Sequence, residues 1–275
     1  MLVYLNGLFV EEKDALLSVL DRGFLYGDGL FETLRISNGR PFLWAAHLER
    51  LQRGAAFLGI PIPHGSELKV AAERLIATNG LPECLIRINV SRGAGEPGYA
   101  PKGASNPTLV MTVRPLPEPV AHWSLVTSTL RVLADDPFSQ FKTCNKLPQI
   151  LARAEAEKAA GDEALLLNDE GSVVEGSSSN IFWVKDDMVF TIPLAAGALP
   201  GVTRALVMEL ALRLGVGIVE RCISPMELRS ADGVFLTLSS LGIVEAVSID
   251  GATFARSPVT ARLIKAYKAC LGADL

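Results

Sequence analysis

The sequence predicts an α+β fold with two domains, and three observations support this prediction. Hairpin signals and helix-like segments are mixed along the whole chain. The 275 residues, 49% of them hydrophobic, are enough to bury one large core or two moderate ones. Residues 115–122 (PLPEPVAH) contain three prolines, which is typical of a linker. We therefore expect an N-terminal α+β domain over 1–118, a linker with the strand that leads into the second domain over 119–130, and a C-terminal α+β domain over 131–275.

The N-terminal domain is predicted to begin with two hairpins, followed by helices and further strands. The first hairpin turns at Asn6-Gly7 and the second at Asn38-Gly39, because these residue pairs tolerate the positive φ angles of a tight turn. Apolar residues then recur at helical spacing, and two strand-like runs flank a glycine-rich loop. The predicted helices cover 45–58 and 66–79, the predicted strands 84–92 and 107–116, and the loop 93–106.

The C-terminal domain is predicted to alternate short strands with helices. Ser224 opens one helix as its cap, with Glu227 completing a capping box, and Ser257-Pro258 opens the last helix. Asp250-Gly251 marks another hairpin turn. A longer helix covers 201–214. The predicted strands cover 123–133, 163–169, 171–175, 180–185, 188–192, 233–238 and 243–249.

Two lysines stand four residues apart in the segment FKTCNKLPQILARAEAEKAAG, residues 141–161. Asn145 is the predicted N-cap of a helix, which leaves Lys142 before the helix and Lys146 on its polar stripe. The predicted apolar stripe consists of Leu147, Ile150, Leu151 and Ala154. The helix pattern does not determine where Lys142 points, so both lysines are expected to be ordinary surface charges unless another part of the sequence indicates otherwise.

Composition and charge exclude several classes of protein. The formal net charge is −4 without a long block of like charges, which argues against a nucleic-acid partner. Four scattered cysteines and three histidines predict no metal site and are typical of a reducing compartment. The N-terminus lacks the pattern of a signal peptide, and no apolar stretch is long enough to span a bilayer. We therefore expect a cytoplasmic protein without a membrane segment.

A motif over residues 173–204 changes the interpretation of the lysine segment. It reads VVEGSSSNIFWVKDDMVFTIPLAAGALPGVTR, and it resembles the signature of the class IV aminotransferases, the fold-type IV enzymes that depend on pyridoxal 5'-phosphate (PLP). The resemblance extends over the chain, in DRGFLYGDGLFETLR, HLERL, FKTCNKLPQILA and LTLSSLGIVEAVSIDG. It implies a two-domain fold like that of D-amino-acid aminotransferases, with PLP between the domains and a C-terminal pseudo-barrel domain that carries the PLP lysine.

The resemblance also implies the residues that serve the cofactor. Lys142, three residues before Asn145, matches the lysine that forms a Schiff base with PLP. Glu175 matches the partner of the pyridine nitrogen, although by itself it could be an exposed strand carboxylate. Both roles need the rest of the motif, which this sequence retains over some thirty residues.

The cofactor phosphate is expected to meet a second set of residues. The backbone N–H groups of Val202 and Thr203 would lie at a helix N-terminus, which attracts anions. Arg50 matches the family's phosphate-contacting arginine, although helix spacing alone would place it on the surface. Ser239 and Ser240 match the remaining hydroxyl positions, and they could equally be turn residues.

Within the family, the sequence favours a lyase that converts 4-amino-4-deoxychorismate to 4-aminobenzoate and pyruvate, a step of folate biosynthesis. Pro97-Gly98-Tyr99 stands where usual D-amino-acid aminotransferases have an Arg-x-His pair, and Lys146 stands where branched-chain enzymes have a tyrosine. The alternative is an aminotransferase of branched-chain or D-amino acids. A non-catalytic binding protein is a third interpretation, which the intact Lys142 and Glu175 disfavour.

Location in the sequence suggests three substrate contacts, and the family suggests the oligomeric state. Tyr26, Arg92 and Tyr99 lie in or beside the segments that match the family's substrate region. The expected partners are a small-molecule substrate and a second copy of the chain in a homodimer. The dimer is implied by the resemblance alone, because the sequence shows no clear interface patch.

Overall fold

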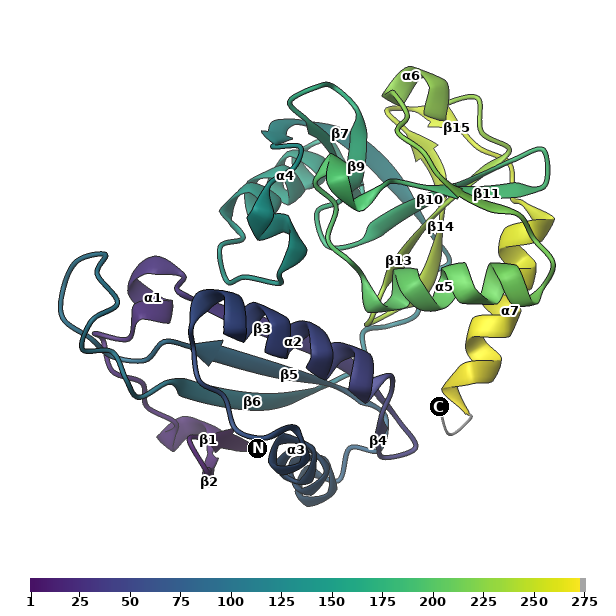
Figure 1. Cartoon of the computed structure of the whole chain (residues 1–275). Helices are drawn as coiled ribbons and strands as arrows, with labels where there is room; N and C mark the ends of the chain where they lie inside the picture. The colour runs from purple at the N-terminus through teal and green to yellow at the C-terminus, as the bar shows by residue number, and fades with distance from the viewer. Residues whose placement is uncertain (273–275) are drawn as a thin grey trace. The chain divides into compact units, whose positions relative to one another are not determined.

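The computed structural model describes residues 1–272, which form two compact units (Figure 1). The N-terminal unit comprises Met1–Pro117 together with Phe141–Asn145. The C-terminal unit comprises Glu118–Gln140 and, among the described residues, 146–272. The chain therefore leaves the C-terminal unit for five residues, and these residues include Lys142.

The sequence predicted Lys142 in the C-terminal domain, and the structure differs for a physical reason. Residues 142–144 run antiparallel to residues 29–31, with the Phe31 N–H donating to the Lys142 carbonyl and the Cys144 N–H to the Gly29 carbonyl, both at 2.9 Å. Phe141 also stacks on Phe57, with ring centroids 4.5 Å apart. These backbone and ring contacts attach the segment to the N-terminal unit.

The N-terminal unit is built on an antiparallel sheet of six strands in the order β2-β1-β6-β5-β3-β4. Alternate residues of the three central strands point to one face, where for example Leu34, Ile86 and Val113 are neighbours across the sheet and buried. The strands are β1 (Leu2–Leu5), β2 (Leu8–Glu11), β3 (Gly29–Ser37), β4 (Arg40–Pro41), β5 (Cys84–Ser91) and β6 (Thr108–Pro115).

Two long helices supply the other half of this core. The apolar face of α2 contributes Leu51 and Ala55, and α3 contributes residues such as Leu68 and Leu75 to the same buried cluster. Both helices end at a glycine with positive φ, which lets the last carbonyls be satisfied. The helices are α1 (Arg22–Tyr26), α2 (Trp44–Leu58) and α3 (Gly65–Asn79), with a short 3₁₀ turn, η1, over Glu12–Asp14.

The C-terminal unit contains a mixed sheet of nine strands that closes into a barrel. Strand β9 pairs with both β8 and β10, so the strands β10-β13-β14-β7-β8-β9 form a ring (Figure 1). Closure leaves β9 and β10 without an open edge on that side. The strands are β7 (His122–Val132), β8 (Glu163–Asn168), β9 (Val173–Gly176), β10 (Asn180–Lys185), β11 (Met188–Thr191), β12 (Ile218–Glu220), β13 (Gly233–Leu238), β14 (Gly242–Ile249) and β15 (Ala252–Thr253).

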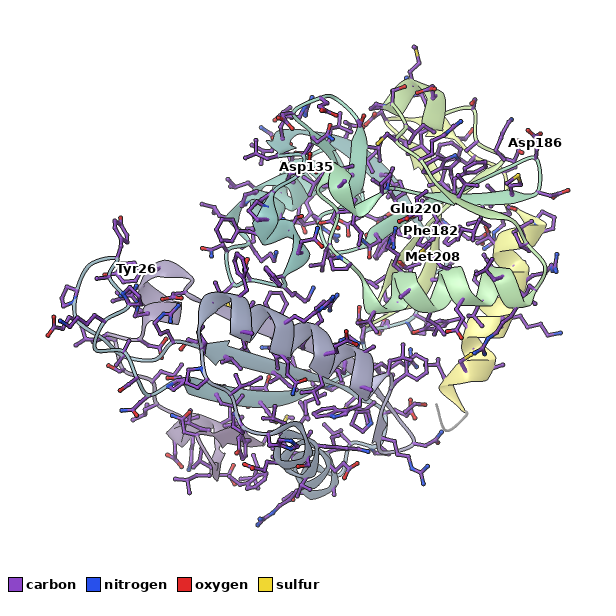
Figure 2. The ribbon with its side chains drawn as sticks, in the orientation of Figure 1. Tyr26, Asp135, Phe182, Asp186, Met208 and Glu220 are labelled. Carbon is purple, nitrogen blue, oxygen red and sulfur yellow. The ribbon has the colours of Figure 1, made fainter. Side chains whose placement is uncertain are left out.

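Helices cover parts of this barrel. Helix α4 contacts β7 and β8, α5 contacts β12 and β13, and α7 contacts α5 and β14. Phe182 of β10, labelled in Figure 2, stacks on Phe235 of β13 with ring centroids 5.0 Å apart, and both side chains are fully buried. The helices are α4 (Leu147–Lys158), α5 (Val202–Arg213), α6 (Pro225–Leu228) and α7 (Pro258–Leu271), with 3₁₀ turns η2 (Pro137–Gln140) and η3 (Leu194–Ala196).

Helix α4 corrects two predictions. Its N-cap is Lys146 rather than Asn145, and the Asn145 amide instead donates to the Gly27 carbonyl. The predicted apolar stripe is also wrong, because all four of its side chains are exposed and the helix packs through the small residues Ala152 and Ala156. The exposed residues of that stripe are Leu147, Ile150, Leu151 and Ala154.

The other local turn and cap signals are confirmed, while short elements were missed. Asn6 and Asn38 have φ angles of 48° and 51° at the two predicted hairpin turns, and Ser224 and Glu227 form the predicted capping box. The sequence did not predict the five-residue helix α1 or the three-residue strand β12. Within residues 1–272, the structure contains no helix with the length and apolar character that crossing a membrane requires.

Candidate active site

The N-terminal unit places Lys142 beside the ring of Phe31. The Lys142 amine nitrogen lies 4.7 Å from the centre of that ring, and backbone hydrogen bonds hold residue 142 alongside β3. Because the segment is paired to a central strand of the sheet, its backbone position is well defined. The lysine is half-buried, in contrast to the exposed surface charge that its sequence environment alone would predict.

A buried ionic cluster of Glu32, His47 and Arg50 lies in the same unit. The Arg50 Nε and Nη2 atoms donate to the two Glu32 carboxylate oxygens at 2.7 and 2.8 Å, and His47 Nδ1 lies 2.7 Å from the same carboxylate. All three side chains are at most 5% exposed. Helix spacing predicted Arg50 on the surface, and this was wrong. His47 and Arg50 lie on the face of α2 that also carries Leu51, a spacing that would have revealed their burial.

The cluster determines the protonation of its members. Burial alone would raise the pKa of Glu32, but the hydrogen bonds from Arg50 and His47 outweigh it and lower that pKa to about 2. Burial lowers the pKa of His47, the Glu32 carboxylate opposes this, and the positive charges of Arg50 and Lys142 add to the lowering. A neutral His47 must then donate its Nδ1 proton, since a carboxylate can only accept.

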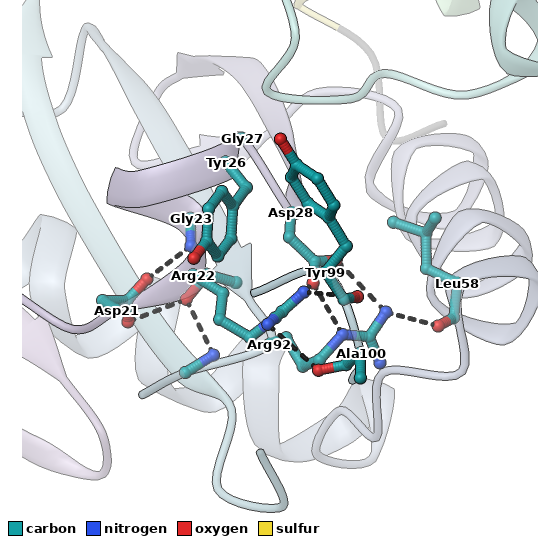
Figure 3. Close-up of polar contacts among 12 residues, drawn as sticks. Asp21, Arg22, Gly23, Tyr26, Gly27, Asp28, Leu58, Arg92, Tyr99 and Ala100 are labelled. Carbon is teal, nitrogen blue, oxygen red and sulfur yellow. Dashed lines mark hydrogen bonds and ion pairs between the residues drawn. The ribbon is translucent and has the colours of Figure 1, made fainter. Parts of the chain in front are cut away.

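The three residues suggested as substrate contacts lie together at one end of the N-terminal unit (Figure 3). The Tyr26 hydroxyl accepts a hydrogen bond from the Gly98 N–H at 2.9 Å, and the Tyr26 and Tyr99 rings meet edge to face. Arg92 is held by Asp28 at 2.7 Å and by the Leu58 carbonyl at 2.8 Å. These contacts give Arg92 a structural role, while its contact with substrate stays a prediction.

Arg87 is a further candidate active-site residue that the sequence interpretation missed. Its guanidinium carbon lies 3.8 Å from the centre of the Phe31 ring, the ring beside which Lys142 also lies. Arg87 donates to the Asn89 side chain at 3.0 Å and is partly exposed. Register with β3 could have revealed it, because strand β5 pairs Arg87 with Thr33, two residues from Phe31.

The C-terminal unit holds Glu175 at the closure of the barrel. Strand β9 meets β10 at the pair Glu175 and Asn180. One carboxylate oxygen of Glu175 accepts from the Asn180 amide at 3.2 Å and from the Leu199 N–H at 3.0 Å. The Asn180 amide donates as well to the Leu199 carbonyl at 2.9 Å. Glu175 is therefore oriented by two donors, as a carboxylate with a specific partner requires.

Two buried hydroxyl groups next to this pair have no hydrogen-bond partner in the described part of the chain. Thr237 lies opposite Asn180 in the sheet, and Ser179 directly precedes Asn180. Their Oγ atoms are buried and unpaired within residues 1–272. A buried polar atom without a partner costs free energy, so this end of the barrel is suited to a polar ligand.

The N-terminus of α5 is the third feature of this region. Gly201 caps the helix without a side-chain hydrogen bond, and Val202 and Thr203 open it as buried residues. A Cβ at position 201 would lie 1.9 Å from the Asn180 Oδ1 atom, so any other residue there would displace the Asn180 side chain. The N–H groups at such an end carry partial positive charge, which suits a phosphate.

The remaining predicted phosphate residues lie at the turn that follows Thr237. Ser239 and Ser240 join β13 to β14 and are half-buried. They are therefore at the strand end where the hydroxyl of Thr237 is unpaired among the described residues. Their contact with phosphate stays a prediction.

Glu163 is a buried carboxylate that the sequence interpretation missed. It is fully buried on β8 and accepts hydrogen bonds from the Ser177 N–H and hydroxyl and from the Ser178 hydroxyl. These bonds shape the turn between β9 and β10, directly after Glu175. The run of three serines after Gly176 was the available signal, because hydroxyl groups in a buried turn need an acceptor.

The fold and the candidate site together define a two-domain enzyme of fold-type IV. The defining features are the barrel, the oriented carboxylate, the helix N-terminus and the lysine on its extended segment. The family described as amino-transferase class IV matches residues 29–249. The chain belongs to this family, which confirms the resemblance seen in the sequence.

Relatives with different activities match nearly the whole chain. A protein of Methanocaldococcus jannaschii, provisionally named a branched-chain-amino-acid aminotransferase, is 39% identical over 256 residues, covering 91% of this chain and 88% of the relative. The aminodeoxychorismate lyase of Bacillus subtilis is 33% identical over 255 residues, covering 90% and 87%. The comparison therefore supports an aminotransferase at least as well as a lyase.

A solved structure confirms the fold. The branched-chain aminotransferase of the thermophilic archaeon Thermoproteus uzoniensis, in a structure with norvaline, superposes with a TM-score of 0.93 at 31% identity, covering 99% of this chain and 95% of the other. The family depends on PLP, and other solved members contain derivatives of this cofactor. The unpaired hydroxyls among the described residues, the helix N-terminus and the oriented Glu175 carboxylate are groups that fit such a cofactor.

Proposed function

We propose that the chain is a PLP-dependent aminotransferase that acts on branched-chain amino acids. The observation that carries this proposal is the 39% identity to the Methanocaldococcus jannaschii protein, which extends over about nine tenths of both chains. It replaces the lyase favoured by the sequence alone, because that preference rested on a few positions. Family membership does not by itself determine the substrate, so the proposal needs a direct assay.

Lys142 is the proposed catalytic residue. PLP, when bound, withdraws electrons from the substrate carbon whose proton is to be removed. The Lys142 amine would hold the cofactor before the reaction and then carry that proton from one carbon to another. The pairing of residues 142–144 with β3 supports this role, because it fixes the backbone that carries the amine.

Glu175 and the helix α5 are proposed to serve opposite ends of the same cofactor. Glu175 would keep a proton on the pyridine nitrogen, and its two donors fix the orientation of the carboxylate for that task. Val202 and Thr203 would bind the phosphate through their N–H groups. Arg50, Ser239 and Ser240 are proposed as additional phosphate contacts.

Arg87 is proposed to bind the carboxylate of the amino-acid substrate. Its guanidinium and the Lys142 amine both lie against the Phe31 ring, so a substrate that reaches Lys142 also comes near a cation. A guanidinium binds a carboxylate with two parallel hydrogen bonds, which gives orientation as well as affinity. Tyr26 and Tyr99 are proposed to contact the side chain of the substrate.

Aminodeoxychorismate lyase is the second candidate. It is supported by Lys146 in place of a tyrosine, by the Gly98-Tyr99 loop and by the 33% identity to the Bacillus subtilis enzyme. The same loop lacks the Arg-x-His pair of the usual D-amino-acid aminotransferases, which makes that alternative weaker.

One set of assays separates these functions. The purified PLP-loaded enzyme is given L-leucine or D-alanine with 2-oxoglutarate, and in parallel 4-amino-4-deoxychorismate alone. We expect glutamate and the keto acid of leucine, with little product from D-alanine. Formation of 4-aminobenzoate and pyruvate without transamination would contradict the proposal and establish the lyase.

A further inference from the structure

The side chain of Arg22 binds the tip of the glycine-rich loop 93–106 (Figure 3). Its Nη1 atom donates to the carbonyls of Gly98 at 2.8 Å and Ala100 at 3.2 Å, and Nη2 donates to the carbonyl of Tyr99 at 3.1 Å. Three consecutive carbonyls are therefore held by one guanidinium. Arg22 itself is only 4% exposed.

Arg22 is in turn held in place by two neighbours. Its Nε atom donates to Asp28 at 2.9 Å, and its guanidinium lies over the Tyr26 ring at 4.9 Å. Burial would raise the pKa of Asp28, but the hydrogen bonds from Arg92 and Arg22 outweigh it and lower that pKa. The charged Asp28 thus fixes the direction in which the Arg22 guanidinium reaches the loop.

The loop needs these contacts because its tip has little other support. Its base is closed where Gly93, with a φ of 84°, packs against the Asn106 carbonyl, and the Arg22 N–H donates to the Gly93 carbonyl. The residues at the tip are exposed, and an exposed loop with few packed contacts opens easily. On the other side, the Tyr26 hydroxyl accepts from the tip at Gly98.

These contacts hold the backbone that brings two aromatic side chains together. The rings of Tyr26 and Tyr99 have centroids 5.6 Å apart at an angle of 63°, and the Tyr99 side chain is 88% exposed. An aromatic side chain so exposed would ordinarily sample several orientations. Here its backbone is held at the residue itself and at both neighbours.

We propose that Arg22 is a positioning residue that fixes the tip of loop 93–106 and so holds Tyr99 against Tyr26 as the surface that selects substrates with large apolar side chains. The proposal rests on the proposed function for the identity of the substrate. The contacts by which Arg22 holds the loop tip do not depend on the proposed function, because every one of them lies within the N-terminal unit.

The first test measures the loop directly. Arg22→Lys keeps the charge beside Asp28, but a single ammonium cannot reproduce the fork that reaches three carbonyls. In the PLP-loaded enzyme we expect hydrogen exchange over 93–106 and chymotrypsin cleavage after Tyr99 to accelerate about tenfold or more, as the loss of one or two net hydrogen bonds implies. Arg114→Lys, at an exposed position of β6, is the matched control. Unchanged exchange and cleavage in Arg22→Lys would overturn the proposal.

The second test measures selection. We expect the ratio of kcat/KM for L-leucine to that for L-alanine to fall in both Arg22→Lys and Tyr99→Ala, mainly through KM, by about tenfold as for a lost apolar contact. The absorbance of the bound cofactor should stay unchanged. A loosened loop with an unchanged ratio would refute the selecting role.

Two further outcomes are distinguishable. If Arg22→Lys fails to fold, Asp28→Asn weakens the hydrogen bond that fixes the Arg22 Nε atom, and the same acceleration is expected. If the wild-type enzyme transaminates no amino acid, the proposed function fails. Cleavage after Tyr99 then still decides whether Arg22 holds the loop tip, and the selecting role falls together with the proposed function.

Discussion

Glu32 is the buried carboxylate that binds both Arg50 and His47. The positive charges of Arg50 and Lys142 both lie close enough to His47 to lower its pKa. Removing a buried carboxylate that binds a guanidinium strongly destabilises a protein, because the remaining cation loses its partner. The geometry of Arg50 therefore depends on Glu32.

Glu32→Gln should change the response of the protein to acid. The pKa of Glu32 lies at about 2 in the folded chain, below its ordinary value of 4.5, so its charge stabilises the fold above pH 4.5 and this contribution is lost as the pH falls toward 2. The stability difference between wild type and variant should therefore shrink over that window, by roughly 3 kcal/mol. Urea unfolding at a series of pH values measures it.

The control for this prediction is Glu73→Gln. Glu73 is exposed and pairs with Lys69 on α3, an arrangement that contributes little. Its stability difference from wild type should be small at every pH. A Glu32→Gln difference that stays constant from pH 7 to the acid limit would contradict the assigned charge state.

Lys142 and Lys146 should differ sharply when tested as cofactor ligands. Borohydride reduction of the loaded enzyme should fix a pyridoxyl group on Lys142, and Lys142→Ala should lower kcat by at least roughly 100-fold because the residue that moves the proton is lost. Mass spectrometry of the peptides identifies the position.

Lys146→Ala is the matched control, because it removes the neighbouring lysine from the start of α4. It should keep both the visible band of the cofactor and the adduct on Lys142. An adduct on Lys146 would show that the motif had been aligned incorrectly.

At the scale of elements, the N-terminus of α5 depends on a single glycine. Gly201→Ala would bring a Cβ to 1.9 Å from the Asn180 Oδ1 atom and force Asn180 away from Glu175 and the Leu199 carbonyl. Such overpacking costs about 1–3 kcal/mol, and the helix N-terminus and Glu175 would both shift. We expect weaker PLP binding, measured by titrating the cofactor-free enzyme.

Gly272→Ala serves as the control for Gly201→Ala, because a Cβ there meets no atom within 4 Å in the described chain. PLP affinity should be unchanged in the control. If Gly201→Ala also bound PLP as tightly as wild type, the N-terminus of α5 would not be the phosphate site.

Elements defined by local chemistry were predictable from the sequence, and elements defined by distant contacts were not. Asn6-Gly7 and the box of Ser224 and Glu227 act within a few residues, so their signals are complete in the sequence. The prediction of the buried face of helix α4 was wrong because that face is made of small alanines, which a search for large apolar residues overlooks. Its phase could not be known without β7 and β8.

The residues of the candidate site follow the same distinction between local signals and distant contacts. Lys142, Glu175 and the N-terminus of α5 were predicted, because each belongs to a contiguous motif. Glu32 was missed, because its partners come from another element and only the packing of α2 on β3 brings them together. Glu163 was missed for a similar reason, since its serine partners belong to a different strand pair.

At the scale of the whole molecule, the homodimer and the cytoplasmic location stay predictions. The structure supplies an exposed apolar surface that a second copy could cover, formed by Leu147, Ile150 and Leu151 on α4. We propose that this surface contributes to a dimer. Replacing all three residues with serine should halve the mass measured by light scattering after size exclusion.

Val70→Ser provides the comparison for this prediction, because Val70 is also an exposed apolar residue on a helix, 65% exposed on α3. It should leave the mass unchanged. A wild-type enzyme with the mass of one chain would exclude the dimer, and a triple variant that remains dimeric would place the interface elsewhere.

The return of residues 141–145 to the N-terminal unit has a consequence for how the gene can be divided. Pro117 is the apparent boundary between the units. A chain cut there would nevertheless separate β3 from residues 141–145, which lie along it and carry Lys142. The two halves are therefore interleaved rather than consecutive modules. Recombination between relatives that exchanges residues 1–117 alone would join a native β3 to a foreign segment 141–145, so functional chimeras should require both pieces to come from one parent.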